Sequence, residues 1–281
     1  MQGKLYLVAT PIGNLEDITF RAIQTLKEVD YIAAEDTRHS IKLLNHYEIR
    51  KPLESYHEHN KMEKGPKMVQ DLLEGKNIAL ITDAGTPAIS DPGEDLVKLC
   101  YENHVEVTSI PGPVALITGL ILSGKNTRRF CFEGFLPFPK KERKEILDLL
   151  KSETRTIIFY EAPHKLKGTL DDLYSAFGDR SITLTRELTK KFEEVMTMSL
   201  SAAVAYYKEQ DPRGEYVLIL EGESVEKQKE DKLEKWLEMT LEEHMAYYIK
   251  KNMTKMEAIK AISKDRNVPR RDVYQYFNRE E

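Results

Sequence analysis

Short apolar runs alternate with segments of helical spacing through the first half of the chain, and no other sequence feature constrains the fold as strongly. Between the runs, apolar residues such as Ala22, Ile23 and Leu26 recur at the spacing of one helix face. This alternation is typical of an α/β fold, in which helices cover a mostly parallel sheet. The runs that we expect to form strands lie at residues 5–9, 31–34, 77–81 and 105–110.

A polar, glycine-containing stretch at residues 123–127 interrupts this pattern, and we place a domain boundary there. Beyond it, the strands near Glu187 and Val195 are joined by so few residues that they predict an antiparallel pair in a mixed sheet. We therefore expect an N-terminal α/β domain at residues 1–123, a C-terminal α/β domain with a mixed sheet at 124–223 and a helical tail at 224–281. The later strands are expected at 130–132, 156–160, 182–185, 195–198 and 216–220, and helices at 140–151, 163–175 and 201–209.

The tail changes its charge along its length. Acidic residues outnumber Lys and Arg by nine to four at residues 221–249, whereas residues 250–279 hold nine Lys and Arg against three acidic residues. Thr254 and Glu257 fit a capping box, and the break at 267–269 followed by a second apolar face gives a helix-turn-helix outline. Two interpretations remain open, a basic module that docks on nucleic-acid phosphates or a small bundle that caps a domain or a dimer partner.

The composition, with 41% hydrophobic and 32% charged residues, is that of a globular protein rather than a disordered or fibrous one. The longest apolar runs fall short of the roughly 20 residues that a membrane span needs, and the N-terminus shows no signal peptide, so we expect a cytoplasmic protein without membrane association. The net charge of −5 argues against a protein that coats nucleic acid uniformly. Cys100 and Cys131 are too few for a disulfide framework or a cysteine metal cage, and we expect both to be reduced and buried.

Three turn-rich loops follow the first, third and fourth predicted strands, at residues 10–15, 83–93 and 111–113. Ligands of open α/β sheets bind beyond the carboxyl ends of the strands, so these loops predict one shared site. Asp91 and Pro92 within the second loop are expected to start a helix that runs to about Asn103. The chain has no glycine-rich dinucleotide fingerprint, phosphate loop or nucleophile elbow, and the spacing in His57-Glu58-His59 matches no helical zinc motif, so we expect no metal site.

Taken together, several ordered motifs make the chain resemble the ribosomal RNA small-subunit methyltransferase I group of the tetrapyrrole methylase superfamily. The resemblance spans almost the whole chain, tail included. The motifs are Ala9-Thr10-Pro11-Ile12-Gly13-Asn14-Leu15-Glu16-Asp17, Ala34-Glu35-Asp36-Thr37-Arg38, Ser55-Tyr56-His57-Glu58-His59-Asn60, Asp83-Ala84-Gly85-Thr86-Pro87, Pro111-Gly112-Pro113 and Tyr160-Glu161-Ala162-Pro163-His164.

This resemblance implies a two-domain α/β enzyme, usually a homodimer, that binds S-adenosylmethionine in the cleft between its domains. It also implies methylation of the ribose 2′-hydroxyl of a cytidine in the decoding region of 16S rRNA, on naked rRNA or on the small ribosomal subunit. Members that modify tetrapyrroles typically carry a more glycine-rich first loop, so the string Pro11-Ile12-Gly13-Asn14 favours the RNA branch.

Methyl transfer from a sulfonium needs no metal, so the protein must chiefly position the donor and the acceptor. A carboxylate could accept the proton of the ribose hydroxyl, and Glu35 and Asp36 are the candidates, although a helix cap or an ion pair with Arg38 would explain them as well. The cofactor-binding candidates are Pro11, Ile12, Gly13, Asn14, Asp83, Ala84, Gly85, Thr86, Pro87, Pro111, Gly112, Pro113, Tyr160, Glu161, Arg186, Glu187, Gly214 and Glu215. The RNA-binding candidates are Arg38, His39, Arg128, Arg129, Lys264, Arg266, Arg270 and Arg271; Lys140, Lys141, Arg143 and Lys144 fit a solvated helix face equally well.

Two other functions remain open at this point. The fold alone would allow a tetrapyrrole methyltransferase that acts on an acidic macrocycle, although a small substrate needs no basic tail. A non-catalytic RNA-binding protein could also keep this architecture, but its loops would not need to bind a sulfonium cofactor.

Overall fold

The computed structural model describes residues 2–278, and its first half is a sheet of five parallel strands in the order β3-β2-β4-β1-β5. β2 and β4 lie inside this sheet and are fully buried, as expected of short apolar strands covered on both faces. The strands are β1 (Lys4–Val8), β2 (Tyr31–Ala34), β3 (Leu53–Ser55), β4 (Ile78–Ile81) and β5 (Glu106–Ile110).

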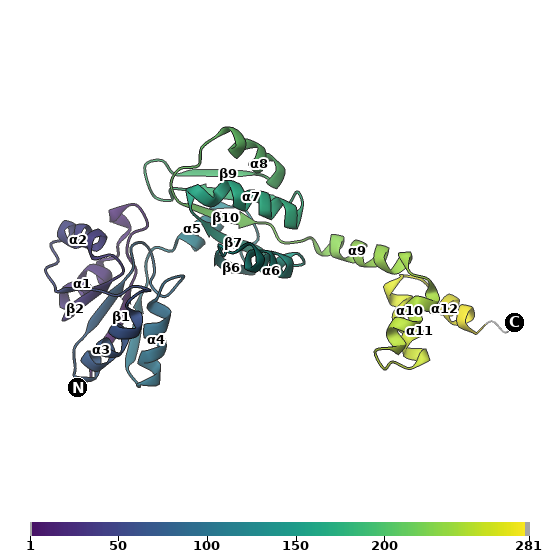
Figure 1. Cartoon of the computed structure of the whole chain (residues 1–281), viewed down its shortest axis with the longest axis horizontal. Helices are drawn as coiled ribbons and strands as arrows, with labels where there is room; N and C mark the ends of the chain where they lie inside the picture. Colours follow the sequence, from purple (N-terminus) through teal and green to yellow (C-terminus); the bar gives the residue numbers. More distant parts are fainter. Residues whose placement is uncertain (1, 279–281) are drawn as a thin grey trace. The chain divides into compact units, whose positions relative to one another are not determined.

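Helices cover both faces of this sheet (Figure 1). On one face, Leu5, Ile78 and Leu80 pack with Met68 and Leu96 of the helices. On the other face, Val8, Ile32 and Ile81 pack with Leu26 and Leu44. The helices of this region are η1 (Leu15–Asp17), α1 (Phe20–Glu28), α2 (Thr37–His46), α3 (Lys61–Leu73) and α4 (Gly93–Glu102), and α5 (Ala115–Leu122) follows β5.

The second sheet is mixed and has the strand order β6-β7-β10-β8-β9. β6 and β7 are parallel, whereas β10 runs antiparallel to both β7 and β8, and β8 runs antiparallel to β9. α5 packs on one face of this sheet through Leu116 and Leu120 against Ile158, Val217 and Ile219. The elements are β6 (Phe130–Phe135), α6 (Lys140–Leu150), β7 (Thr156–Glu161), α7 (Pro163–Phe177), β8 (Ser181–Arg186), β9 (Glu194–Ser199), α8 (Leu200–Glu209) and β10 (Tyr216–Leu220).

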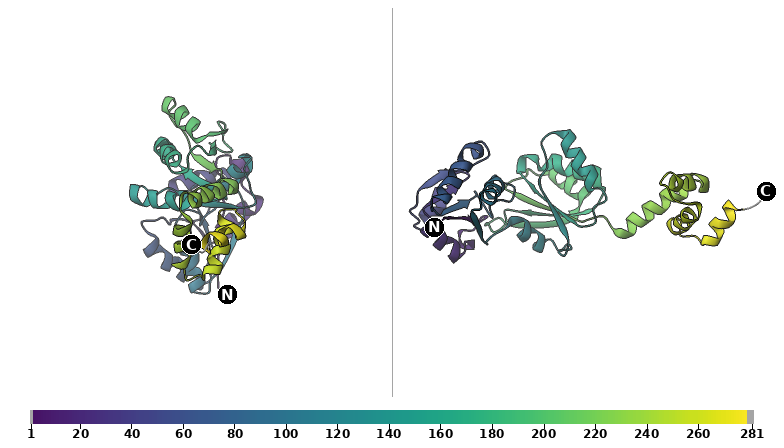
Figure 2. Two further views of the ribbon diagram at one scale, coloured as in Figure 1. Left: turned by 90° about the vertical axis from the view of Figure 1, so that its right-hand side faces the viewer. Right: turned by 90° about the horizontal axis from the view of Figure 1, so that it is seen from below.

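The chain divides into two compact units. Unit 1 comprises the residues up to Leu149 together with Arg155–Glu221, and unit 2 comprises Leu150–Thr154 and the residues from Gly222 onward. Unit 2 is helical, and α10, α11 and α12 pack against one another around Ile259, Ile262 and Val273 (Figure 2). Its helices are α9 (Val225–Glu238), α10 (Leu241–Ile249), α11 (Lys255–Asp265) and α12 (Arg270–Phe277).

Most sequence predictions of this architecture are confirmed, including the α/β fold, the mixed second sheet, the antiparallel pair near Glu187 and the capping box at Thr254. β3 was not predicted, so two of the loops follow the fourth and fifth strands rather than the third and fourth. α4 begins at Gly93, and Asp91 accepts a hydrogen bond from the Gly93 amide at 2.8 Å. Within residues 2–278, no helix is long and apolar enough to cross a membrane.

Two further expectations concern the burial of the cysteines and the boundary between the domains. Cys100 is buried, and burial raises the pKa of its thiol to about 11, but the expected burial of Cys131 is wrong because this side chain is only partly covered. The expected domain boundary after residue 123 assigns α5 to the first domain, whereas α5 packs on the second sheet. Of the expected tail, residues 279–281 lie outside the described residues.

Candidate functional site

Two pairs of contacts hold the three predicted loops together at the carboxyl edge of the first sheet. Thr10 and Gly85 form an isolated antiparallel bridge in which each amide donates to the other carbonyl, at 2.8 and 3.1 Å. The hydroxyl of Thr86 donates to the Pro113 carbonyl at 3.1 Å. Because each loop directly follows a parallel strand, the sheet itself brings these segments to one place.

A cavity of about 470 Å³, here called the first cavity, opens between this edge and the strand ends of the second sheet. Its volume lies within the ~300–1,000 Å³ that small-molecule sites usually have. β10 contributes its first residues, because it runs antiparallel to β7 and β8 and so starts where they end. The lining includes Ile12, Glu35, Thr82, Asp83, Ala84, Gly85, Thr86, Asp91, Val114, Phe135, Tyr160, Glu161, Leu188, Glu215 and Val217.

The charged side chains that line the first cavity are all acidic. Five carboxylates border the first cavity, and none of the described lining residues is Lys, Arg or His. A sulfonium ligand such as S-adenosylmethionine carries positive charge beside an apolar adenosine, and the apolar residues Ile12, Val114 and Val217 supply a matching wall. The residues present therefore fit the cofactor that the resemblance implies. The five carboxylates are those of Glu35, Asp83, Asp91, Glu161 and Glu215.

The two candidate bases, Glu35 and Asp36, occupy different environments. Glu35 lines the first cavity, and its Oε2 accepts a hydrogen bond from the Thr82 hydroxyl at 2.9 Å. Asp36 caps α2 through the Arg38 amide at 2.8 Å and pairs with the Arg38 guanidinium, also at 2.8 Å. These Arg38 contacts lower the pKa of Asp36 to about 2. Because Asp36 lines neither cavity and its carboxylate is paired with Arg38, the geometry favours Glu35 over Asp36 as the proton acceptor.

Tyr160 and Glu161, at the end of β7, both reach the first cavity. The Tyr160 hydroxyl accepts a hydrogen bond from the Leu116 amide at 3.1 Å, and its ring packs edge-on to Phe132. Burial raises the pKa of this phenol. The buried carboxylate of Glu161 accepts hydrogen bonds from the Ala162 amide at 2.9 Å and the Thr169 hydroxyl at 2.5 Å, so it fixes the start of α7.

Of the four remaining candidates in the second sheet, Glu215 lines the cavity and the others do not. Glu187 accepts hydrogen bonds from the Lys190 ammonium at 2.9 Å and the Glu215 amide at 3.0 Å. Partial burial opposes the shift, but these contacts lower the pKa of Glu187. Arg186 pairs with Glu194 on β9, and a Cβ on Gly214 would lie 2.5 Å from the Glu187 side chain. Arg186, Glu187 and Gly214 thus build the frame around Glu215 and do not border the cavity.

A second cavity, of about 500 Å³, lies beside the first and shares five lining residues with it. Pro11 and Gly13, which the sequence placed in the cofactor site, line this second cavity instead. Its other lining residues include His39, Ser40 and Lys42 of α2, together with Lys190. The shared residues are Ile12, Thr82, Asp83, Ala84 and Glu215.

The remaining loop candidates support the cavities from outside. Asn14 donates its amide to the Thr189 hydroxyl at 3.0 Å, which links the first loop to the turn after β8. Pro87, Pro111, Gly112 and Pro113 do not line either cavity. A Cβ on Gly112 would lie 2.9 Å from the Ala9 Cβ, so glycine is required here for packing against β1 rather than for approach to a ligand. Gly85 does line the first cavity, and its φ of +85° disfavours any side chain.

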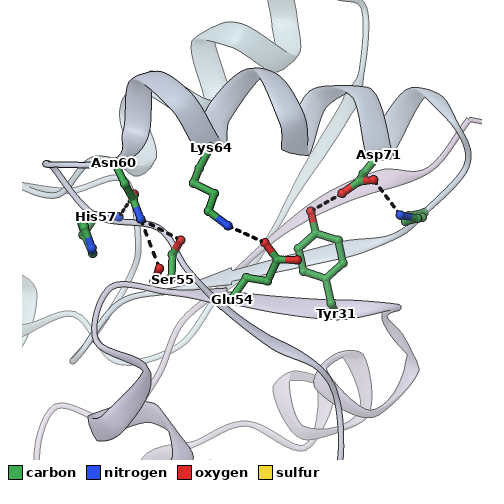
Figure 3. A network of polar contacts seen from close by, with 8 residues as sticks. Tyr31, Glu54, Ser55, His57, Asn60, Lys64 and Asp71 are labelled. Atoms are coloured by element: carbon green, nitrogen blue, oxygen red, sulfur yellow. Dashed lines mark hydrogen bonds and ion pairs between the residues drawn. The ribbon is translucent and has the colours of Figure 1, made fainter.

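The motif at residues 55–60 forms a turn after β3. Figure 3 shows Asn60 reaching back to this turn, where its amide donates to the Ser55 carbonyl at 3.1 Å and its Oδ1 accepts from the His57 amide at 2.9 Å. The buried Tyr56 donates its hydroxyl to the Pro92 carbonyl at 3.2 Å, which ties the turn to the loop that precedes α4. Among the described residues, no group of three or more His, Cys, Asp and Glu side chains is arranged to hold a metal.

The RNA-binding candidates lie in different surroundings. Arg38 is exposed and paired with Asp36, whereas Arg128 and Arg129 are exposed in the loop before β6. Arg143, one of the less specific candidates, pairs with Asp172 at 2.5 Å. Lys264, Arg270 and Arg271 are exposed on unit 2.

Arg266 differs from the other cations of unit 2, because contacts inside the helical bundle occupy its guanidinium. Its Nε donates to the Nδ1 of His244 at 3.1 Å, and its Nη2 donates to the carbonyls of Met239 and Thr240 at 2.5 and 3.0 Å. The His244 ring is buried and stacks on Trp236 at 4.1 Å between centroids. The structure therefore gives Arg266 a structural role.

Sequence reasoning missed the apolar wall of the first cavity. Val114, Phe135, Leu188 and Val217 belong to none of the predicted motifs, and a single apolar residue carries no sign that it lines a cavity. Thr82 was also missed, although its position next to Asp83 at the end of a strand was a usable signal.

Comparison with known proteins identifies a matching family model and several similar relatives. The family model described as Tetrapyrrole (Corrin/Porphyrin) Methylases matches residues 4–204. A protein of Bacillus subtilis named Ribosomal RNA small subunit methyltransferase I is 52% identical over 277 residues, covering 98% of this chain and 94% of that protein. The protein of the same name from Halalkalibacterium halodurans is 49% identical over 279 residues, covering 99% and 96%.

Solved structures with much lower identity share the fold of unit 1. Diphthine synthase has a TM-score of 0.60 at 13% identity and covers 79% of this chain and 91% of its own. The uroporphyrin-III-C-methyltransferase from Thermus thermophilus has a TM-score of 0.55 at 17% identity, covering 78% of this chain and 94% of its own. At these identities the likeness concerns the fold alone.

Proposed function

The chain belongs to the tetrapyrrole (corrin/porphyrin) methylase family, and we propose that it is an S-adenosylmethionine-dependent methyltransferase that acts on ribosomal RNA. The acceptor that we propose is the ribose 2′-hydroxyl of a cytidine in 16S rRNA, presented as rRNA or within the small ribosomal subunit in the cytoplasm. The observation that carries the RNA assignment is the 49–52% identity to methyltransferases of that name over 98–99% of the chain.

Sequence identity supports RNA rather than a tetrapyrrole as the acceptor. The uroporphyrin-III-C-methyltransferase is 17% identical to this chain, whereas the two relatives named for ribosomal RNA are 49% and 52% identical. The family model ends at residue 204, before unit 2 begins again at Gly222. Unit 2 thus lies outside the matched family model, and an additional domain is more useful for a macromolecular substrate than for a small one.

S-adenosylmethionine held in the first cavity by the carboxylates and the apolar wall would supply an electrophilic methyl group and a neutral thioether leaving group. The protein contributes position, charge and a proton acceptor. Its five carboxylates attract a cation into a cavity with an apolar wall. Thr82 holds the Glu35 carboxylate in place through the hydrogen bond of 2.9 Å, and we assign to Glu35 the proton that leaves the ribose hydroxyl.

We also propose that the protein acts as a homodimer, and α5 supports this. α5 is apolar all round, yet Ile117, Ile121 and Leu122 are exposed while Leu116 and Leu120 pack on the second sheet. An exposed apolar helix face is unfavourable in water and typical of an interface. Ile121→Glu should convert a dimer into a monomer in sedimentation analysis, whereas a wild-type protein that sediments as a monomer would contradict the dimer.

Two experiments test the proposed activity. Calorimetric titration with S-adenosylmethionine tests the donor, because a non-catalytic RNA-binding protein need not bind it. Incubation of the protein with labelled donor and small ribosomal subunits from a strain that lacks the gene then tests the acceptor. Label in a 2′-O-methylated nucleoside supports the proposal, and label on a base, or none, overturns it.

A further inference from the structure

The donor binds in the first cavity, which leaves the second cavity without a role. The residues that line the second cavity indicate which kind of ligand fits it. Three basic side chains reach it, from His39, Lys42 and Lys190, which the first cavity lacks. Lys190 is already bridged by Glu187 and Glu215 at 2.9 Å each, so its charge is largely compensated. His39 and Lys42 lie one turn apart on α2, are exposed, and form no ion pair within the described residues.

Ser40, between these two residues, provides an independent observation. The residue is only 2% exposed and lines the second cavity, yet its Oγ makes no hydrogen bond with any described residue. A buried hydroxyl without a partner lowers stability, so such groups are uncommon unless a ligand or water pairs with them. The site therefore offers a free hydroxyl next to two groups that can donate to an anion.

The second cavity is also placed for transfer. Ile12, Thr82 and Asp83 are among the five residues that border both cavities, so the two cavities adjoin each other at these residues. Its volume of about 500 Å³ is within the range of small-molecule sites. An acceptor nucleotide has the matching chemistry, with an anionic phosphate and sugar hydroxyls that can pair with a side-chain hydroxyl.

We propose that the second cavity belongs to the acceptor subsite and holds the phosphate side of the nucleotide to be methylated, so that the ribose 2′-hydroxyl reaches the first cavity, where Glu35 and the methyl donor lie. Lys42 and His39 contact the phosphate, and Ser40 pairs with a hydroxyl or phosphate oxygen. This inference rests on the proposed function, because it takes RNA as the acceptor. It assigns Pro11 and Gly13 to the acceptor side rather than to the cofactor.

The test compares Lys42→Ala with Lys27→Ala, which removes the same charge from an exposed position on α1. With small ribosomal subunits as substrate, Lys42→Ala should raise KM about tenfold and reduce the slope of log KM against log salt by about 1, because one phosphate contact is lost. The Kd for S-adenosylmethionine should stay unchanged. Lys27→Ala should leave all three quantities as in wild type.

Ser40→Ala separates a ligand contact from a structural role. If the hydroxyl has no protein partner, its removal should leave Tm unchanged or raise it, while KM for the subunits increases. A lower Tm in Ser40→Ala, or KM values unchanged in both Ser40→Ala and Lys42→Ala, would overturn the subsite. Wild-type protein that methylates no ribosomal substrate would instead overturn the proposed function, so the two failures can be told apart.

Discussion

The first and second cavities share a wall but differ in charge, and the difference follows from the elements that build them. The loops after β2 and β4, the last residue of β7 and the residue before β10 bring carboxylates to the first cavity, whereas α2 brings His39 and Lys42 to the second. One edge of a parallel sheet can thus present a cation site and an anion site side by side. For a reaction between a sulfonium and a nucleotide, this arrangement attracts the donor to the first cavity and the phosphate of the acceptor to the adjoining second cavity.

Glu35→Gln should have the largest effect, because Glu35 accepts the proton at the transfer step, whereas for donor binding it is only one of five carboxylates. Loss of a positioned general base typically lowers the rate by about 10²- to 10⁴-fold. We expect that loss in kcat with the Kd of S-adenosylmethionine and the Tm close to wild type. Single-turnover methyl transfer measures it. Equal losses of Tm and of activity would mean that Glu35 holds the fold.

Gly85→Val should reduce donor binding more than RNA binding, because Gly85 lines the first cavity and not the second. The positive φ of Gly85 disfavours a side chain, and a Cβ there would lie 3.3 Å from the Ile12 side chain. We expect the affinity for S-adenosylmethionine to fall about 10- to 100-fold, corresponding to the ~1–3 kcal/mol of such backbone strain. Calorimetry checks this, with the affinity for RNA as the internal control. Unchanged donor affinity in a folded protein would place the cofactor elsewhere.

Neutralising Lys264, Arg270 and Arg271 together should weaken RNA binding and leave the donor side intact. These exposed cations of unit 2 release counterions if they contact phosphates, so the slope of log K against log salt should fall by about 2 to 3. Arg266→Ala is the matched contrast, since it removes the contacts to His244, Met239 and Thr240 and should lower Tm instead. An unchanged salt slope with full methylation would make unit 2 purely structural.

Asp36→Asn should have the smallest effect and should act on stability rather than on either cavity. The pKa of Asp36 is lowered to about 2 by Arg38, against about 3.9 in an unfolded chain. Its contribution is therefore complete above about pH 4 and disappears as the pH falls toward 2. Thermal melts should show a slightly lower Tm for the variant at pH 7 and no difference near pH 2. A kcat loss as large as that of Glu35→Gln would instead make Asp36 the base.

The sequence predicted the carboxylate-bearing loops of the first cavity better than its apolar lining or the basic residues of the second cavity. Loops 10–15, 83–93 and 111–113 were visible because glycine and proline mark turns after strands, and parallel strands end at one edge. Val114, Leu188 and Val217 were not visible, because an apolar residue that lines a cavity has the same local pattern as one in a core. Their role depends on how the second sheet faces the first.

The structure also differs from the sequence predictions at β3, at Arg266 and in the lining of the second cavity. β3 has three residues and includes Glu54, so it lacks the length and apolar pattern that predict a strand. Arg266 lies in a basic stretch and is predicted from the sequence to bind RNA, but the carbonyls that accept its hydrogen bonds lie in the turn between α9 and α10, which is distant in sequence. Lys42 and Ser40 were missed because a single lysine or serine on a helix carries no signal until the neighbouring loop closes a cavity around it.

Nucleoside analysis of ribosomal RNA by mass spectrometry tests the central claim most directly, namely that this chain methylates a ribose of 16S rRNA. Deletion of the gene should remove one 2′-O-methylated cytidine from 16S rRNA, and the wild-type gene should restore it while the Glu35→Gln gene should not. An unchanged set of methylated nucleosides after deletion, or loss of a base methylation instead of a ribose methylation, would contradict the account.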